Sequence, residues 1–221
     1  SMEIPARPML APNFGHVTPW TITSAQVYST YRLPPPPAVG TPEFQTALDE
    51  VLHYSENATR EEQHIAFRWD DGTSTYTPPG HWNYIATPYI HDAHLNPLRA
   101  ARVFSYLNMA MQDAGICVWD SKYYYFFPRP TNVNPDIKTI LPIPNFPSYP
   151  SGHSGFSAAG AAVLGYFFPA QAAYFEQQAE EAAFSRLYGC IHYRFDCVDG
   201  IMQGKNVAQN AINLAKADGG E

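Results

Sequence analysis

The sequence predicts an all-α fold in which a helix bundle follows an irregular, proline-rich N-terminal arm. From residue 41 onward, apolar residues recur at the spacing of one helical face, and no segment alternates apolar and polar residues as a half-buried strand does. Residues 1–42 hold nine of the chain's 21 prolines and show no helical period. We therefore expect an extended arm over 1–40 and a helical-bundle domain over 41–221.

Helix starts are marked by residues that suit the first turn of a helix. Pro42 follows Thr41, and proline is favoured at the first helical position. Thr59 and Glu62 have the spacing of a capping box. The helix that opens at Pro97 has the widest apolar face and should lie at the centre of the bundle. Helices are expected from 42, over 59–71, near 80–95, from 97 to about 122, and over 154–168, 170–188 and 191–216.

Composition excludes several classes of function. The 221 residues are 45% hydrophobic and 15% charged, which suffices for a buried core. The formal net charge of −7 argues against nucleic acid as a partner. No apolar run reaches the 18 residues of a membrane span, so none is expected. Ser1-Met2 is typical of a cloning remnant, so an export signal could have been removed. The compartment is therefore unknown, with a periplasmic or secreted location left open.

A second proline-rich loop, 128–150, ends at Ser151-Gly152-His153, and a helix rich in glycine and alanine follows. Two interpretations are open. Ser151 suits the N-cap of that helix. Alternatively, the free backbone N–H groups and the helix dipole make this point an anion site.

Three basic side chains stand where the predicted elements meet: Lys122, Arg129 and Arg186. In an acidic and largely apolar chain they favour an anion, each contributing about 4 kcal/mol of attraction at about 4 Å and an effective dielectric constant of about 20. Arginine offers planar forks to paired oxygens, and lysine acts as a point charge. The hydroxyl of Ser151 and the N–H of Gly152 would add donors, so the pattern predicts a site for a tetrahedral oxyanion.

Two histidines complete the predicted site. His192 and Asp196 are four residues apart on a predicted helix, so the carboxylate can hold one ring nitrogen and present the other. His153 is then left for general acid–base chemistry. Each of these residues alone is more typical of a cap, a helix-dipole partner or a buried structural histidine. Their ordered combination favours the oxyanion site.

Three segments resemble the motifs shared by the type 2 phosphatidic acid phosphatases and the vanadium-dependent haloperoxidases. They are 122–130 (Lys-x6-Arg-Pro), 150–153 (Pro-Ser-Gly-His) and 185–196 (Ser-Arg-x5-His-x3-Asp). Every fixed position matches in order, whereas the upstream part resembles bacterial haloperoxidase-like proteins only loosely.

The resemblance implies that 41–221 is a catalytic domain with vanadate as its cofactor, and phosphate is expected to fit the same site. His153, His192 and Asp196 would be catalytic. His192 would ligate the metal of vanadate, or would attack phosphorus to form a phosphohistidine. The oxygens of the anion would be held by the cofactor-binding residues Lys122, Arg129, Ser151, Gly152, Arg186 and His192.

Trp119 and Phe146 are similar in position to the apolar residues that flank the halide site in the chloroperoxidase-like branch. An apolar wall suits a weakly hydrated halide, because exclusion of water strengthens the remaining electrostatic interactions. Packing in the core explains both residues equally well, so a halide pocket and core packing stay open.

The first hypothesis is a vanadate-dependent haloperoxidase that takes hydrogen peroxide and a halide. The second is a soluble acid phosphatase that hydrolyses a phosphomonoester, and the third is an anion receptor without turnover. We expect Asp113 and Asp120 to pair with arginines such as Arg186 or Arg194. Because haloperoxidases of this family carry a longer helical region ahead of the active site, the chain is either a fragment or covered by a second copy. We predict a homo-oligomer.

Overall fold

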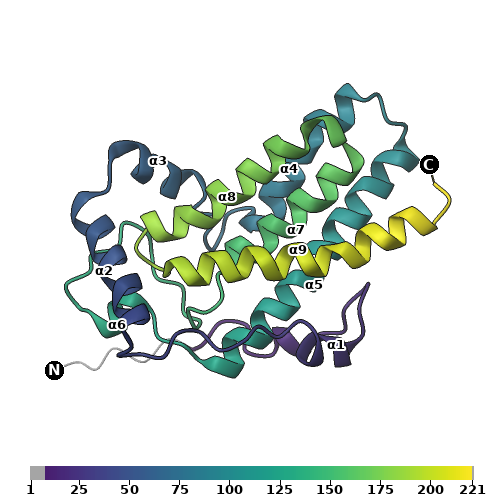
Figure 1. Cartoon of the computed structure of the whole chain (residues 1–221). Helices are drawn as coiled ribbons and strands as arrows, with labels where there is room; N and C mark the ends of the chain where they lie inside the picture. The colour runs from purple at the N-terminus through teal and green to yellow at the C-terminus, as the bar shows by residue number, and fades with distance from the viewer. Residues whose placement is uncertain (1–7, 221) are drawn as a thin grey trace.

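The computed structural model describes residues 8–220, and within them it contains helices and no strand, which confirms the all-α prediction (Figure 1). The elements, in chain order, are η1 Phe14–His16, α1 Ser24–Ser29, α2 Pro42–Asn57, α3 Arg60–Arg68, α4 Thr77–Asp92, α5 Pro97–Tyr125, α6 Pro130–Val133, α7 Gly152–Phe167, η2 Pro169–Gln171, α8 Ala172–Tyr188 and α9 Arg194–Ala217.

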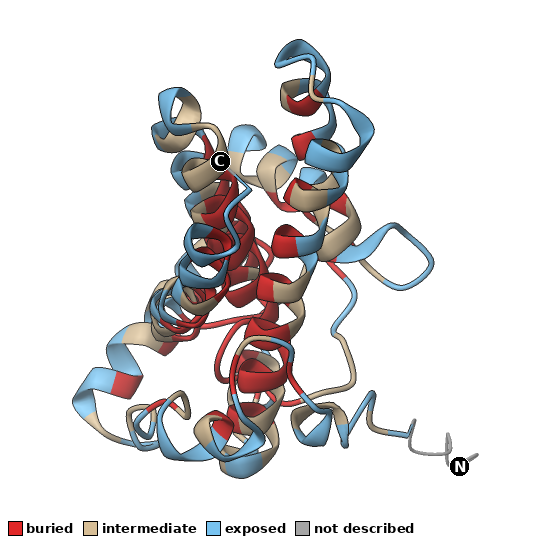
Figure 2. Ribbon diagram, turned by 90° about the vertical axis from the view of Figure 1, so that its right-hand side faces the viewer, coloured by how far each residue is buried: buried red, intermediate tan, exposed pale blue. Residues whose placement is uncertain are grey.

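Helix α7 lies at the centre of the bundle and packs against α5, α8 and α9. Buried residues concentrate along these helices (Figure 2). Glycines let α7 and α9 come close, because a Cβ atom on Gly204 would lie 2.3 Å from the carbonyl oxygen of Gly155. The start of α9 also meets the start of α7, where the N–H of Ser151 donates to the carbonyl of Asp196 at 2.9 Å. Small side chains therefore bring two motif segments together.

The helix boundaries differ slightly from those expected. Helix α5 continues to Tyr125, and α7 begins at Gly152 rather than at 154. Ser151 is the N-cap of α7, and its hydroxyl accepts from the N–H of Ser154 at 3.3 Å. The capping box of Thr59 and Glu62 is present at the start of α3, as predicted. A single turn of helix, α6, lies inside the loop predicted over 128–150.

The N-terminal arm is irregular for most of its described length and lies against α5 (Figure 1). It also contains α1, a short helix with a capping box made by Thr23 and Gln26. The backbone of the arm is tied to the bundle near its proline run, where the carbonyl of Pro34 accepts from the hydroxyl of Tyr149 at 2.9 Å. Residues 1–7 of the predicted arm lie outside the described residues, and the division at 40 stays a prediction.

Neither Asp113 nor Asp120 pairs with Arg186 or Arg194 as predicted, although Asp120 does pair with another arginine. Asp113 accepts from the backbone N–H of Trp20 at 2.8 Å and of Thr21 at 2.7 Å. Asp120 pairs with Arg32 at 2.7 Å. Both carboxylates face the arm rather than the predicted site, so they anchor the arm to α5. The expected arginine Arg194 pairs instead with Glu50 on α2 at 2.6 Å, and the contacts of Arg186 are described below.

Candidate active site

The three motif segments come together at the ends of four helices. Lys122 lies in the last turn of α5 and Arg186 in the last turn of α8, while Arg129 immediately precedes α6 and His192 lies two residues before α9. These side chains are buried, with 0% of Lys122, 4% of Arg129, 2% of Arg186 and 2% of His192 exposed. The charges of the three cations lower the pKa of His192, in addition to the larger effect of burial. Residues as far apart as 122 and 192 therefore share one buried electrostatic environment.

Lys122 and Arg129 are held by backbone carbonyls of the proline-rich loop. The ammonium group of Lys122 donates to the carbonyls of Pro147 and Ser148, both at 2.8 Å. The Nε of Arg129 donates to the carbonyl of Phe146 at 3.2 Å. Prolines give this loop few backbone donors of its own, so its carbonyls are free to accept from the cations.

Arg186 is held by the carbonyl end of α3 and the turn that follows it. Its Nη2 donates to the carbonyl of Trp69 at 2.5 Å and to that of Ala66 at 3.1 Å. The unpaired carbonyls at a helix C-terminus carry partial negative charge, so this end of α3 is a suitable support for a guanidinium group. No side-chain pattern in the sequence could have indicated it, because the acceptors belong to the backbone.

The three cations lack carboxylate partners: within residues 8–220, none of them forms an ion pair. Burial lowers the pKa of Arg129 and of Arg186 to about 10 each, and it lowers that of Lys122 well below its usual range. Asp196 is the nearby buried acid, and burial raises its pKa. The site therefore holds more positive than negative charge away from water, which favours a bound anion.

Asp196 fixes the orientation and the tautomer of His192. Its Oδ2 lies 2.7 Å from the Nδ1 of His192 and accepts from the hydroxyl of Ser148 at 2.5 Å. On the other side of the ring, Nη1 of Arg129 lies 2.9 Å from Nε2. Arginine can only donate, so Nε2 carries the lone pair and Nδ1 carries the proton that Asp196 accepts. The sequence indicated Asp196 through its spacing but gave no signal for Ser148.

His153 occupies the first turn of α7. Its Nε2 is buried and has no hydrogen-bond partner within the described residues. Burial lowers the pKa of His153 well below its usual range, and the charges of Arg186 and Lys122 add to this effect. A neutral imidazole whose Nε2 has no partner, placed among cations, is suited to take a proton from, or return one to, a group bound between them.

Trp119 and Phe146 form one aromatic cluster beside the cations. Their ring centroids lie 5.1 Å apart, and the ammonium nitrogen of Lys122 lies 5.0 Å from the centroid of Phe146. The six-membered ring of Trp119 also covers Gly152, where an added Cβ would lie 3.3 Å from Cζ3. Phe14 of the arm packs edge-on against Trp119 at 5.5 Å, a contact that sequence patterns did not indicate. The wall that these rings make thus meets the cationic site directly.

The family model of the PAP2 superfamily matches residues 102–216, more than half of the chain. The chain belongs to the PAP2 superfamily. The matched region contains every motif residue described above. Among curated proteins, none matches the chain.

Solved structures of vanadium-dependent haloperoxidases are similar to this PAP2 superfamily member. A bacterial vanadium-dependent iodoperoxidase has a TM-score of 0.83 and 29% identity, over 96% of this chain and 58% of that protein. An apo-form bacterial vanadium-dependent chloroperoxidase has a TM-score of 0.80 at 15% identity, over 95% of this chain and 56% of that one. The second likeness concerns the fold alone. The chain therefore spans less than two thirds of the length of these proteins.

Among residues 8–220, no helix is both long and apolar enough to cross a membrane. The membership in an enzyme superfamily and the likeness to haloperoxidases indicate that this chain is an enzyme.

Proposed function

We propose that the protein is a vanadate-dependent haloperoxidase, which oxidises a halide with hydrogen peroxide to hypohalous acid. The observation that carries this proposal is the contact between an unbalanced cationic site and an aromatic wall. Lys122 lies against Phe146 and Trp119, at 5.0 Å and 5.9 Å from their ring centroids. A phosphomonoesterase has no evident need for such a wall, whereas a weakly hydrated halide does. The likeness to a bacterial iodoperoxidase supports the same choice.

The residues present fit vanadate. Three buried cations face one buried carboxylate, so a multiply charged oxyanion balances the charge of the site. Lys122, Arg129, Arg186 and the first turn of α7 would hold its oxygens, and Nε2 of His192 would be the ligand of its metal. When bound, vanadate would supply the Lewis-acidic centre that activates hydrogen peroxide toward a halide.

Arg129 must move for this ligand to bind. Its Nη1 donates to Nε2 of His192 at 2.9 Å and to the carbonyl of Ile191 at 2.6 Å. Binding at Nε2 would exchange the first of these hydrogen bonds for one to the anion. Asp196 keeps the ring oriented meanwhile, and His153 can hold a proton from the peroxide at its free Nε2.

The test is turnover by the vanadate-loaded chain with hydrogen peroxide, a halogen-accepting dye, and chloride, bromide or iodide in turn. We expect turnover with at least one halide, and its loss in His192→Ala. Phe146→Ala should reduce turnover while vanadate affinity changes little, because the ring touches the halide side of the site. Absence of turnover with all three halides between pH 5 and pH 8 would refute the proposal.

The alternative function is hydrolysis of phosphomonoesters through a phosphohistidine at His192. The observation that favours it is the lone pair on Nε2, which Asp196 orients as it would for a nucleophile. Hydrolysis of p-nitrophenyl phosphate without added metal, inhibited by vanadate and lost in His192→Ala, would support it. No hydrolysis of any phosphomonoester would exclude it.

The homo-oligomer expected from the sequence stays a prediction, and light scattering tests it.

A further inference from the structure

An open pocket of about 540 Å³ lies outside the candidate active site, between α3, α4 and the start of α8. Its lining includes Arg68, His81, Tyr84, Thr87, Tyr89 and Tyr174. Trp69 separates the two sites, because its ring lies 4.3 Å from that of His81 while its carbonyl accepts from Arg186. The pocket is thus a neighbour of the oxyanion site and shares none of its residues.

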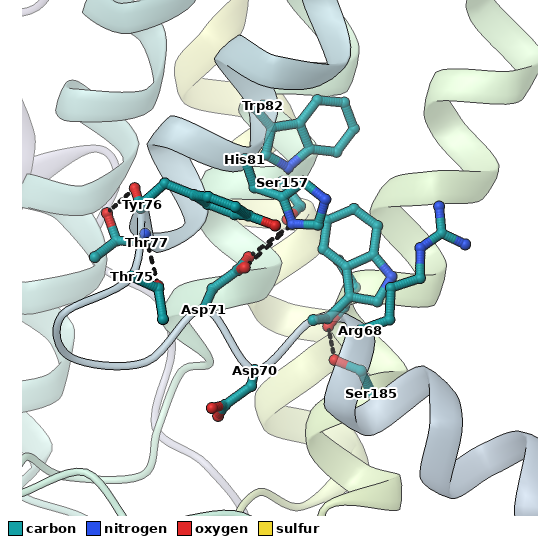
Figure 3. A network of polar contacts seen from close by, with 12 residues as sticks. Arg68, Asp70, Asp71, Thr75, Tyr76, Thr77, His81, Trp82, Ser157 and Ser185 are labelled. Carbon is teal, nitrogen blue, oxygen red and sulfur yellow. Dashed lines mark hydrogen bonds and ion pairs between the residues drawn. The ribbon is translucent and has the colours of Figure 1, made fainter.

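His81 contributes an unpartnered nitrogen to this pocket. The residue is only 7% exposed, and its Nδ1 lies 3.1 Å from Oδ2 and 3.2 Å from Oδ1 of Asp71. When the ring carries one proton, the carboxylate accepts it at Nδ1, and Nε2 keeps its lone pair. In Figure 3 Nε2 points away from Asp71, and no described residue donates to it. Trp69 and Tyr76 lie against the ring, with centroids at 4.3 Å and 5.0 Å, so Nε2 is the polar atom left to meet a ligand.

The charges around the pocket disfavour an anionic ligand. Arg68 is paired with Glu181 at 3.0 Å and donates to Gln178 at 2.6 Å. The same Glu181 oxygen also accepts from the indole N–H of Trp69 at 2.8 Å. With Asp71 as a second acid, no positive charge is left over for a ligand. A neutral hydrogen-bond donor suits this environment better than a carboxylate or a phosphate.

The walls of the pocket are aromatic. Tyr89 and Tyr174 have ring centroids 6.2 Å apart, and 73% of Tyr84 is exposed. Flat aromatic ligands pack well against such rings, and apolar walls with one oriented polar group are typical of small-molecule sites. We propose that this pocket binds phenols, whose hydroxyl donates to Nε2 of His81 and whose ring packs against the tyrosines.

This inference rests on the proposed function for its role in catalysis. Phenols are electron-rich and react with hypohalous acid, the product proposed for the neighbouring site. In that reaction a carbon–halogen bond forms, the oxygen–halogen bond breaks, the ring proton is lost, and water is released. The pocket would therefore hold the organic acceptor beside the source of the halogenating agent.

Binding is tested on the full chain without vanadate, by calorimetric titration with phenol and with anisole. For a ligand of seven heavy atoms, we expect a dissociation constant of about 1 mM for phenol. Anisole has the same ring but no hydroxyl donor, so we expect binding about tenfold weaker. Equal affinity for the two compounds, or no binding of phenol, would overturn the assignment.

Two threonines provide a matched pair of variants. Thr87 lines the pocket. Thr46 on α2 is also exposed and makes the same kind of hydrogen bond to the carbonyl four residues before it. Thr87→Trp should fill the pocket and abolish phenol binding, while Thr46→Trp should leave it unchanged. If Thr87→Trp binds phenol as the unmodified chain does, the pocket is not the site.

Failure of this inference and failure of the proposed function have different signatures. If phenol binds while no halide is oxidised, the assignment of the pocket as a phenol site is supported and the proposed haloperoxidase activity is excluded. If halides are oxidised and Thr87→Trp halogenates phenol as fast as the unmodified chain, the role of the pocket is excluded and the haloperoxidase stands.

Discussion

Acid should destabilise the anion-free protein through the two buried histidines of the candidate site. The pKa of His153 and that of His192 lie well below the usual value, because both rings are buried among cations. In the unfolded chain each takes up a proton near pH 6.5, whereas in the folded chain it stays neutral. The contribution of these two neutral histidines to the free energy of unfolding is therefore fully present above about pH 6.5. It is lost as the pH falls toward their pKa values in the folded chain.

The size of the effect follows from these shifts. Between pH 7.5 and pH 5.5 each histidine that stays neutral in the folded chain costs about 1–1.5 kcal/mol, so the two together cost about 2–3 kcal/mol. Asp196 acts in the opposite direction, because burial raises its pKa to about 6, and it offsets about 1 kcal/mol of this loss. The net loss from these three groups is about 1–2 kcal/mol, and Lys122, whose pKa burial also lowers, adds to it in the same direction. A loss of this size corresponds to a fall of about 2–8 °C in Tm for a domain of this size.

Thermal unfolding in buffers free of oxyanions measures this loss. His192→Gln should remove the part of the pH-dependent loss that one histidine causes, about 1–1.5 kcal/mol. His91→Gln is the control and should keep the full pH dependence, because the side chain of His91 is 82% exposed. Added phosphate should flatten the pH dependence, since an anion beside the rings stabilises their protonated forms. A Tm that is unchanged between pH 7.5 and pH 5.5 would refute the reasoning.

Three further substitutions probe separate contacts. Asp196→Asn removes the carboxylate that orients His192, and by analogy with triad enzymes turnover should fall by about 10²–10⁴ in a steady-state assay. Ser148→Ala leaves the same carboxylate short of a donor, and chemical denaturation should show a loss of about 1.5–3 kcal/mol; a change below about 0.5 kcal/mol would contradict the contact. Gly204→Ala places a Cβ against α7 and should cost at least about 1–3 kcal/mol of stability, while Gln209→Ala on the exposed face of the same helix should cost little.

Local sequence signals predicted most of the helices because they act through neighbours in the chain. The capping box of Thr59 and Glu62 and the proline at 97 mark true helix starts. The arm was harder to predict. Helix α1 has only six residues, and its one buried side chain, Val27, packs into the main core of the bundle. A helix this short depends on tertiary contacts that no local pattern reveals.

Side-chain motifs in the sequence predicted residues of the candidate site but not the backbone groups that hold them. The spacing of His192 and Asp196 predicted their hydrogen bond, although His192 lies two residues ahead of α9 and not on the helix expected over 191–216. Backbone acceptors, such as the carbonyl of Trp69 that accepts from Arg186, could not be predicted. Every residue type carries a backbone carbonyl, so the sequence does not mark the ones that are used. The pairing of Asp113 with the arm was missed because its donors lie more than ninety positions away in the chain: they are the backbone N–H groups of Trp20 and Thr21 and the hydroxyl of Thr21.

Calorimetric titration of vanadate into the unmodified chain and into Lys122→Met, Arg129→Gln, Arg186→Gln and His192→Ala tests most directly whether separate segments hold one oxyanion. We predict one vanadate per chain. Loss of each cation should weaken binding by up to about a thousandfold, since each contributes about 4 kcal/mol at about 4 Å, and His192→Ala should weaken it as well. Unchanged affinity in any of the four variants, or more than one equivalent bound, would contradict the account.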